Sequence, residues 1–78
     1  MCYLTKINPQ ENQRRFYLID VRPTLIGDHC LIRVHGRIGG WSKPLLPIPY
    51  PTEAEAIVAA DKLLQKRLRR GYRIAWDP

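Results

Sequence analysis

The chain has 78 residues, with 13 Lys or Arg against 7 Asp or Glu, so its formal net charge at pH 7 is +6. This length allows one small domain, residues 1–78, and excludes doubly wound dinucleotide folds and α/β barrels, because each βαβ unit takes about 30 residues or more. Apolar residues make up 45% and charged residues 26%, which is typical of a folded globular protein and argues against disorder. A domain this small has one thin core, so we expect a flat binding surface.

The N-terminal segment, 1–10, lacks the apolar stretch of a secretory signal, and no apolar run approaches the roughly 20 residues that span a bilayer. We therefore expect a cytoplasmic protein with no membrane partner. Its two cysteines, Cys2 and Cys30, have neither the density of a disulfide framework nor metal-ligand spacing. They are expected to be buried reduced thiols, and a single bridge stays open as an alternative.

The N-terminal half is predicted to form a succession of β-strands. A first strand at 3–7 is followed by turn-forming residues at 8–12. A second strand at 15–21 is apolar on both faces apart from Arg15 and Asp20, as expected of a central strand. After a turn at 27–28, a third strand begins at His29, and the two glycines at 39–40 predict a hairpin to a short fourth strand at 41–43.

The next segment, 44–51, contains four prolines in eight residues. This density excludes a central strand and a helix, so we predict an extended connection. Its PxxP pattern also occurs in polyproline II ligands, but apolar proline loops in small domains usually pack against the domain itself.

A helix is predicted to begin at Glu53, because Thr52 and Glu55 form a capping box, and to end before Gly71, which supplies a left-handed cap. At 100° per residue its apolar side chains gather on one face, which we expect to meet the sheet: Ala56, Ile57, Ala60, Leu63, Leu64 and Leu68. Residues 72–76 either add an edge strand or lie against the domain. We therefore predict an α+β fold, a small antiparallel sheet of four or five strands with one helix packed on it.

Residue groupings that indicate catalysis or a metal site are nearly absent. The single serine, Ser42, lies in no nucleophile elbow, and His29, Cys30 and His35 do not match a structural zinc spacing. Neither GxGxxG nor GxxxxGK occurs. We predict no enzymatic activity, no cofactor and no metal.

Positive charge is concentrated at the end of the predicted helix, where six cations fall within twelve residues without an acid: Lys62, Lys66, Arg67, Arg69, Arg70 and Arg73. Such a cluster either attracts a polyanion such as nucleic acid or complements the negative end of the helix dipole.

A second basic stretch surrounds Gly36. If the third strand continues through it, a period of two sends Arg33, His35 and Arg37 to one face, and Ile32, Val34, Gly36 and Ile38 to the core. Cations at this spacing can follow a phosphate backbone, and a glycine between them would let a sugar or phosphate approach the main chain. The alternative is a solvated strand face whose arginines pair with acids on the neighbouring strand.

The same stretch resembles the signature of the WGR domain family, a Trp-Gly-Arg triplet followed by Val or Ile and Gly. Here it reads His35-Gly36-Arg37-Ile38-Gly39, with histidine in the tryptophan position. Residues 15–18 resemble the family's aromatic strand, 52–56 the start of its single helix, and 66–72 its basic helix end with a terminal Gly-Tyr. The likeness covers about residues 14–73, especially to short bacterial single-domain members.

The resemblance implies a non-catalytic nucleic-acid-binding module of the kind found in poly(ADP-ribose) polymerases and bacterial proteins. In the DNA-repair polymerases the family tryptophan packs against a sugar near a DNA end, and the triplet arginine helps to join DNA binding to neighbouring domains. Here His35 can stack or, when protonated, contact phosphate. Trp41 either supplies the missing aromatic surface or packs inside the domain.

We therefore predict binding to nucleic acid, DNA rather than RNA, through phosphate and sugar contacts that respond to structure rather than base sequence. The expected binding residues are Arg33, His35, Gly36, Arg37, Trp41, Lys43, Lys66, Arg67, Arg69 and Arg70. The alternative is a protein-interaction adaptor that uses the Arg37 region, with Trp41, Tyr50, Trp76 and the proline segment as its apolar contact surface.

Overall fold

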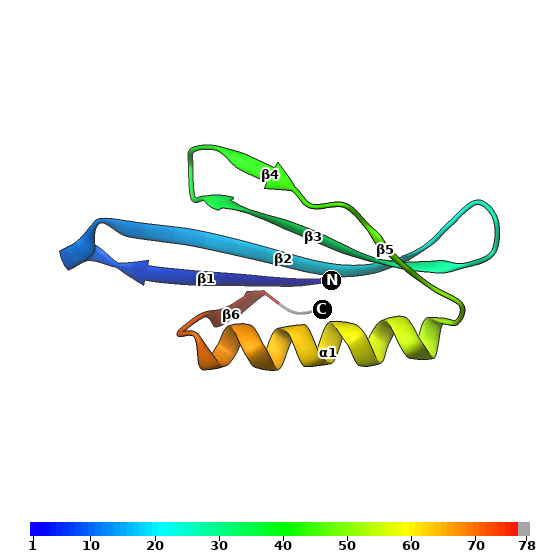
Figure 1. Ribbon diagram of the computed structural model, residues 1–78. Coiled ribbons are helices and arrows are strands. Elements are labelled where there is room, and N and C mark those ends of the chain that lie inside the picture. The colour runs from blue at the N-terminus through cyan, green and yellow to red at the C-terminus, as the bar shows by residue number, and fades with distance from the viewer. Residues whose placement is uncertain (77–78) are drawn as a thin grey trace.

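The computed structural model describes residues 1–76, which form one antiparallel sheet with a single helix packed on one of its faces (Figure 1). Its elements in chain order are β1 (Cys2–Asn8), a 3-10 turn (Pro9–Glu11), β2 (Gln13–Pro23), β3 (His29–Arg37), β4 (Ser42–Pro44), β5 (Ile48–Tyr50), α1 (Glu53–Arg69) and β6 (Arg73–Trp76). The predicted α+β class is confirmed. Residues 77 and 78 of the predicted domain lie outside the described residues.

The sheet has six strands in the order β4-β3-β2-β1-β6, and β5 pairs with β3 beside β4. The extra strand, β5, comes from the proline segment, which tolerates Pro49 because it lies at an edge of the sheet. β1 pairs with residues 13–19 of β2, so residues 20–23 of β2 extend beyond β1. The molecule is elongated, with extents of 45 × 23 × 20 Å.

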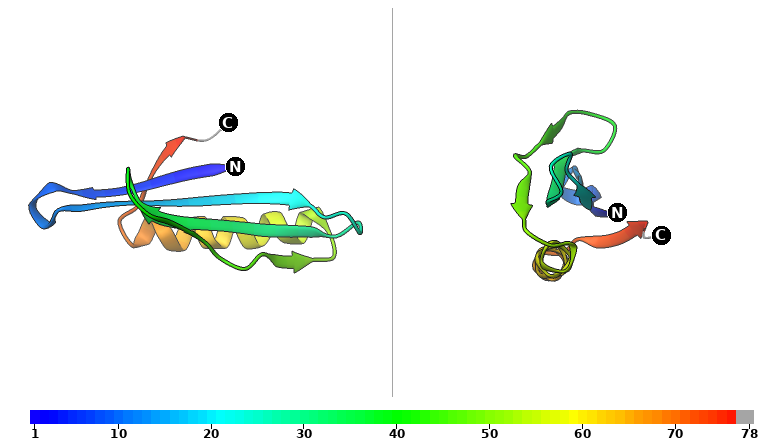
Figure 2. Two further views of the ribbon diagram at one scale, coloured as in Figure 1. Left: turned by 90° about the horizontal axis from the view of Figure 1, so that it is seen from above. Right: turned by 90° about the vertical axis from the view of Figure 1, so that its right-hand side faces the viewer.

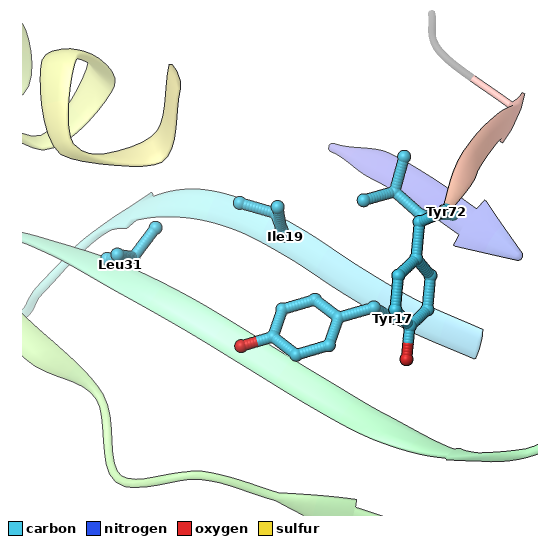
Figure 3. Close-up of a cluster of buried hydrophobic side chains, with 5 residues drawn as sticks. Tyr17, Ile19, Leu31 and Tyr72 are labelled. Atoms are coloured by element: carbon cyan, nitrogen blue, oxygen red, sulfur yellow. The ribbon is translucent and has the colours of Figure 1, made fainter. Parts of the chain in front are cut away.

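The core lies between α1 and one face of the sheet, which we call the helix face. Seen end-on, α1 follows one side of the sheet only (Figure 2, right). Tyr17, Ile19 and Leu31 are buried on this face, and Tyr72 closes the cluster after the helix (Figure 3). The aromatic rings of Tyr17 and Tyr72 meet edge to face, with centroids 6.2 Å apart.

The expectation about which side of β3 faces the core was wrong. Residues paired across antiparallel strands share a face, and Ile19 pairs with Arg33 while Tyr17 pairs with His35. Arg33, His35 and Arg37 do share one face, but it is the helix face. The predicted core set, Ile32, Val34, Gly36 and Ile38, alternates with them and, within β3, points to the opposite face of the sheet. Because β3 carries apolar residues on both sides, alternation alone did not distinguish the face that α1 covers.

The helix begins at Glu53, as predicted, where the Thr52 hydroxyl accepts a hydrogen bond of 3.2 Å from the Glu55 amide. It ends before Gly71, whose φ of 96° is the predicted left-handed conformation. Ala56 is buried and the three leucines are half-buried against the core, but Ile57 is 50% exposed. This isoleucine lies on the flank of α1 rather than on the centre of its core-facing side.

Residues 73–76 form the edge strand that was one of two expectations for this segment. Cys30 is a free thiol, and both Cys2 and Cys30 are half-buried rather than fully buried. Within residues 1–76, no helix combines the length and apolarity needed to cross a bilayer.

A small charge cluster surrounds Asp20 where β2 extends beyond β1. Its carboxylate lies 2.6 Å from Arg22 Nε and 3.4 Å from the Met1 ammonium, and it accepts a hydrogen bond of 2.9 Å from the Val21 amide. Partial burial favours the protonated form, but the hydrogen bond from Arg22, the ammonium charge and the Val21 amide outweigh it. Together they hold the pKa of Asp20 below its ordinary value of 3.8.

We expect Asp20→Asn to lower the free energy of unfolding by about 1 kcal/mol at pH 7, because a charge-assisted hydrogen bond is lost. A carboxyl whose pKa is lowered by folding stabilises the folded state above its unfolded pKa, and this contribution disappears as the pH falls below 3.8 through the folded value. Urea unfolding of both proteins at pH 7 and at pH 2.5 measures the difference. A difference of the same size at both pH values would contradict its electrostatic origin.

Candidate nucleic-acid interface

Three cations lie side by side across the sheet at the end where α1 stops. Lys6 of β1 pairs with Arg15 of β2, and Arg15 pairs with Arg37 of β3. We call these three residues the basic row. They lie on the helix face, near the end of α1, and β1 and β2 extend past that end of the helix (Figure 1). Like charges directly opposite each other on neighbouring strands destabilise a sheet, so these three cations do not contribute to its stability through their charges.

The charge of Arg37 is held in place without being neutralised. Its Nη1 donates to the Asn12 carbonyl oxygen at 3.0 Å, and its Nη2 donates to Asn12 Oδ1 at 3.2 Å. Arg33 likewise donates from Nη2 to the Leu46 carbonyl oxygen at 2.9 Å. These acceptors are neutral, and the ion pairs found within residues 1–76 involve only Asp20 and Glu53 as acids. The alternative in which these arginines pair with cross-strand acids was therefore wrong.

An aromatic pair lies next to the basic row. His35 pairs with Tyr17 on one side and with Lys43 of β4 on the other. The His35 and Trp41 rings are perpendicular, with centroids 5.6 Å apart, and Trp41 is 58% exposed. Trp41 is therefore not a core residue, and its ring is available to a ligand at the position where the sequence lacks the signature tryptophan.

Gly36 is needed for packing, and it also lines a hollow that Arg37 and Trp41 border. A Cβ at this position would clash with the Trp41 carbonyl oxygen and lie 2.8 Å from Ser42 Cα and 2.9 Å from Phe16 Cε1. The β3–β4 hairpin therefore fills the space in which a side chain at this position would lie. Gly36 contributes indirectly, because this close approach positions Trp41 beside His35.

A hollow of about 410 Å³ opens between the β1–β2 turn and the start of the β3–β4 hairpin. Its cationic lining consists of Arg14, Arg15 and Arg37, with Trp41 at one side and Glu11 as its acidic residue. The volume falls within the range of about 300 to 1,000 Å³ of small-molecule sites. The hollow thus brings together two exposed arginines, the half-buried Arg37 and an aromatic ring.

The cations at the end of α1 fall into two groups. The Arg67 guanidinium carbon lies 4.3 Å from the centroid of the Tyr17 ring, so this side chain packs against the sheet beneath the helix. Lys66 and Arg69 are exposed on the outer side of α1, turned away from the basic row by the helical period. Arg70 caps the helix. The structure thus brings Arg67 and Lys43 near His35 but does not bring Lys66 or Arg69 to the same face.

The apolar surface expected for an adaptor is not contiguous. Tyr50 packs against the core. Trp41 precedes β4 and Trp76 ends β6, and these strands form opposite edges of the sheet.

Lys6 and Arg15 were absent from the residues predicted to bind. The turn after β1 pairs Asn8 with Gln13, and counting back along both strands pairs Lys6 with Arg15. Because the turn at residues 8–12 was predicted from the sequence, the strand register that it sets could have identified Lys6 and Arg15 as neighbours.

The family model of the WGR domain matches residues 1–77 of this chain. An uncharacterized protein of Sinorhizobium fredii (strain NBRC 101917 / NGR234), y4dW, is 34% identical over 71 residues, which are 91% of this chain and 34% of the relative. The chain therefore spans about a third of the length of that relative. No solved structure matches the chain. With a match along nearly its whole length, the chain belongs to the WGR domain family, whose members are generally nucleic-acid-binding modules.

Proposed function

We propose that this protein is a non-catalytic module that binds DNA through its sugar-phosphate backbone, by structure rather than by base sequence. The basic row carries the proposal. Lys6, Arg15 and Arg37 lie on neighbouring strands, and none of them enters an ion pair within residues 1–76. Three cations on one face of the sheet can contact the phosphates of a nucleic-acid backbone. The net charge of +6 adds a long-range attraction to any polyanion.

The aromatic pair supplies a second kind of contact. Trp41 offers an exposed ring to a sugar or an unpaired base, and His35 supports it edge to face. Lys43, Arg33 and the end of α1 extend the cationic surface on either side. Lys66 and Arg69 contact the DNA only if the bound DNA continues around the end of α1, because both residues lie on the outer side of the helix.

Base-specific reading is not expected from this architecture. α1 packs lengthwise on the sheet, and its first turn carries Glu53 and Glu55, which would repel a DNA groove. Contacts to phosphates orient a protein without reading sequence. The preference for DNA over RNA follows the resemblance to the WGR domains of DNA-repair polymerases.

The test is fluorescence anisotropy with labelled blunt, nicked and single-stranded DNA, and with an RNA duplex of the same sequence, over a series of salt concentrations. If about six phosphates are neutralised on duplex DNA, the logarithm of affinity falls against the logarithm of salt with a slope of about −5. Scrambling the base sequence should leave affinity unchanged. A slope near zero, or tighter binding to the RNA duplex, would contradict the proposal.

A further inference from the structure

A second hollow, of about 470 Å³, lies along the other half of the helix face, beside the first turns of α1. Its floor and walls are mainly apolar, with Ile19 and Val21 from β2 and Ile57 and Leu64 from α1. α1 packs over β2, β3 and β5, which leaves the β1 side of this face less covered. The hollow is therefore a groove between one flank of the helix and the sheet.

Exposed apolar side chains gather around the same end of the molecule. Ile57 is half exposed on the groove wall and Val58 follows it, while Leu25 and Ile26 are almost fully exposed on the β2–β3 turn. Figure 1 shows that this turn and the start of α1 lie at the same end. Of these four residues only Ile57 lines the groove. The apolar lining of the groove is the surface that another molecule would cover.

The rim of the groove is acidic although the protein as a whole is basic. Glu53 and Asp61 lie eight residues apart on the same flank of α1 and both line the groove. Asp61 enters none of the ion pairs formed within residues 1–76, and the Glu53 carboxylate lies 3.4 Å from His29 Nε2. A ligand that complements this rim carries positive charge beside apolar side chains.

The open edge of β2 limits what form this ligand takes. Residues 20–23 of β2 extend beyond β1, but the Val21 amide already donates to the Asp20 carboxylate at 2.9 Å. A side chain that satisfies an edge amide disfavours the addition of another strand. The wall from Glu53 to Leu64 spans about 17 Å, or roughly three helical turns, which suits a second helix packed alongside α1.

We propose that this groove binds a basic amphipathic helix of a partner protein, lying alongside α1. Its apolar side chains would contact Ile19, Val21, Ile57 and Leu64, and its Lys or Arg side chains would face Glu53 and Asp61. The site is separate from the basic row, so a partner and a nucleic acid bind at the same time.

The experiment is a selection from a phage-displayed library of randomised helical peptides of about 14 residues, which is roughly four turns. The full chain is the target, and the double variant Ile57→Ala, Asp61→Lys serves for counter-selection. We expect enriched peptides with apolar residues at helical spacing and Lys or Arg on the flank. Titration of the best peptide into labelled protein should shift the amide resonances of Val21, Ile57 and Leu64.

Matched substitutions separate the groove from the surrounding surface. Ile57→Ala and Asp61→Lys should each weaken the selected peptide about tenfold, whereas Val58→Ala and Asp28→Lys, which change equivalent side chains outside the groove, should leave its affinity within twofold. Thermal unfolding verifies that all four variants are folded. Absence of enrichment over the double variant, peptides without helical spacing or positive charge, or equal effects of the paired substitutions would overturn the proposal.

Discussion

Replacing Gly36 by alanine is expected to destabilise the domain by about 3 kcal/mol, the upper end of the usual range for overpacking. The added Cβ would overlap the Trp41 carbonyl oxygen and press on Ser42 Cα and the Phe16 ring. Two of these three neighbours are backbone atoms, so relief requires the β3–β4 hairpin to move. For a domain of this size the change corresponds to a fall in the unfolding temperature of roughly 12 to 24 °C, measured by circular dichroism.

Gly40→Ala is the matched control in the same hairpin. The atoms nearest to a Cβ there belong to the Arg37 side chain, at 3.5 Å or more, which is ordinary van der Waals contact. Its stability should stay within about 0.5 kcal/mol of the original protein. If both alanines destabilise equally, the hairpin is sensitive to lost glycine flexibility in general and not to the close approach at Gly36.

The double variant Lys6→Gln, Arg15→Gln is expected to bind DNA about 60-fold more weakly in 0.1 M salt and to reduce the salt slope by about 1.8, because two phosphate contacts are lost. The same variant should be more stable than the original protein by a few tenths of a kcal/mol, since it removes the like-charge pairs of the basic row. Anisotropy and urea unfolding measure the two quantities. Weaker binding together with higher stability cannot be explained by misfolding.

Lys66→Gln, Arg69→Gln provides the control with an identical loss of net charge. Both residues are exposed on the outer side of α1, so we expect a loss of affinity of less than about fivefold, from the general field alone. A loss as large as that of the basic-row variant would extend the interface around the helix end. Unchanged affinity in the basic-row variant would show that DNA contacts another surface.

The features predicted correctly from the sequence depend on local signals. The start of α1 at Glu53 follows from a threonine and a glutamate three residues apart, and its end follows from one glycine with positive φ. The β1–β2 turn follows from composition over a few residues, whereas the edge strand after Gly71 was one of two alternatives that the sequence left open. Each of these signals is carried by residues that lie within a few positions of one another in the sequence.

The features that were missed depend on contacts between distant segments. Leu31 and Ile32 make both sides of β3 apolar, so the face that meets α1 was decided by buried neighbours on β1 and β2. The basic row requires the register of three strands, and Lys6 and Arg15 are unremarkable as single charges. The role of Gly36 appears only when the β3–β4 hairpin folds back over it.

The elongated shape has a consequence for how this molecule meets a charged polymer. Along its long axis of 45 Å, the basic row lies toward the end where α1 stops, whereas the β2–β3 turn, which contains Asp28, and the start of α1 at Glu53 lie toward the other end (Figure 1). The electric field around a polyanion exerts a torque on a protein with this charge distribution, and the torque turns the cationic end of the protein toward the polyanion before contact. The fraction of collisions that arrive correctly oriented then rises, and it falls again when added salt shortens the Debye length below about 10 Å.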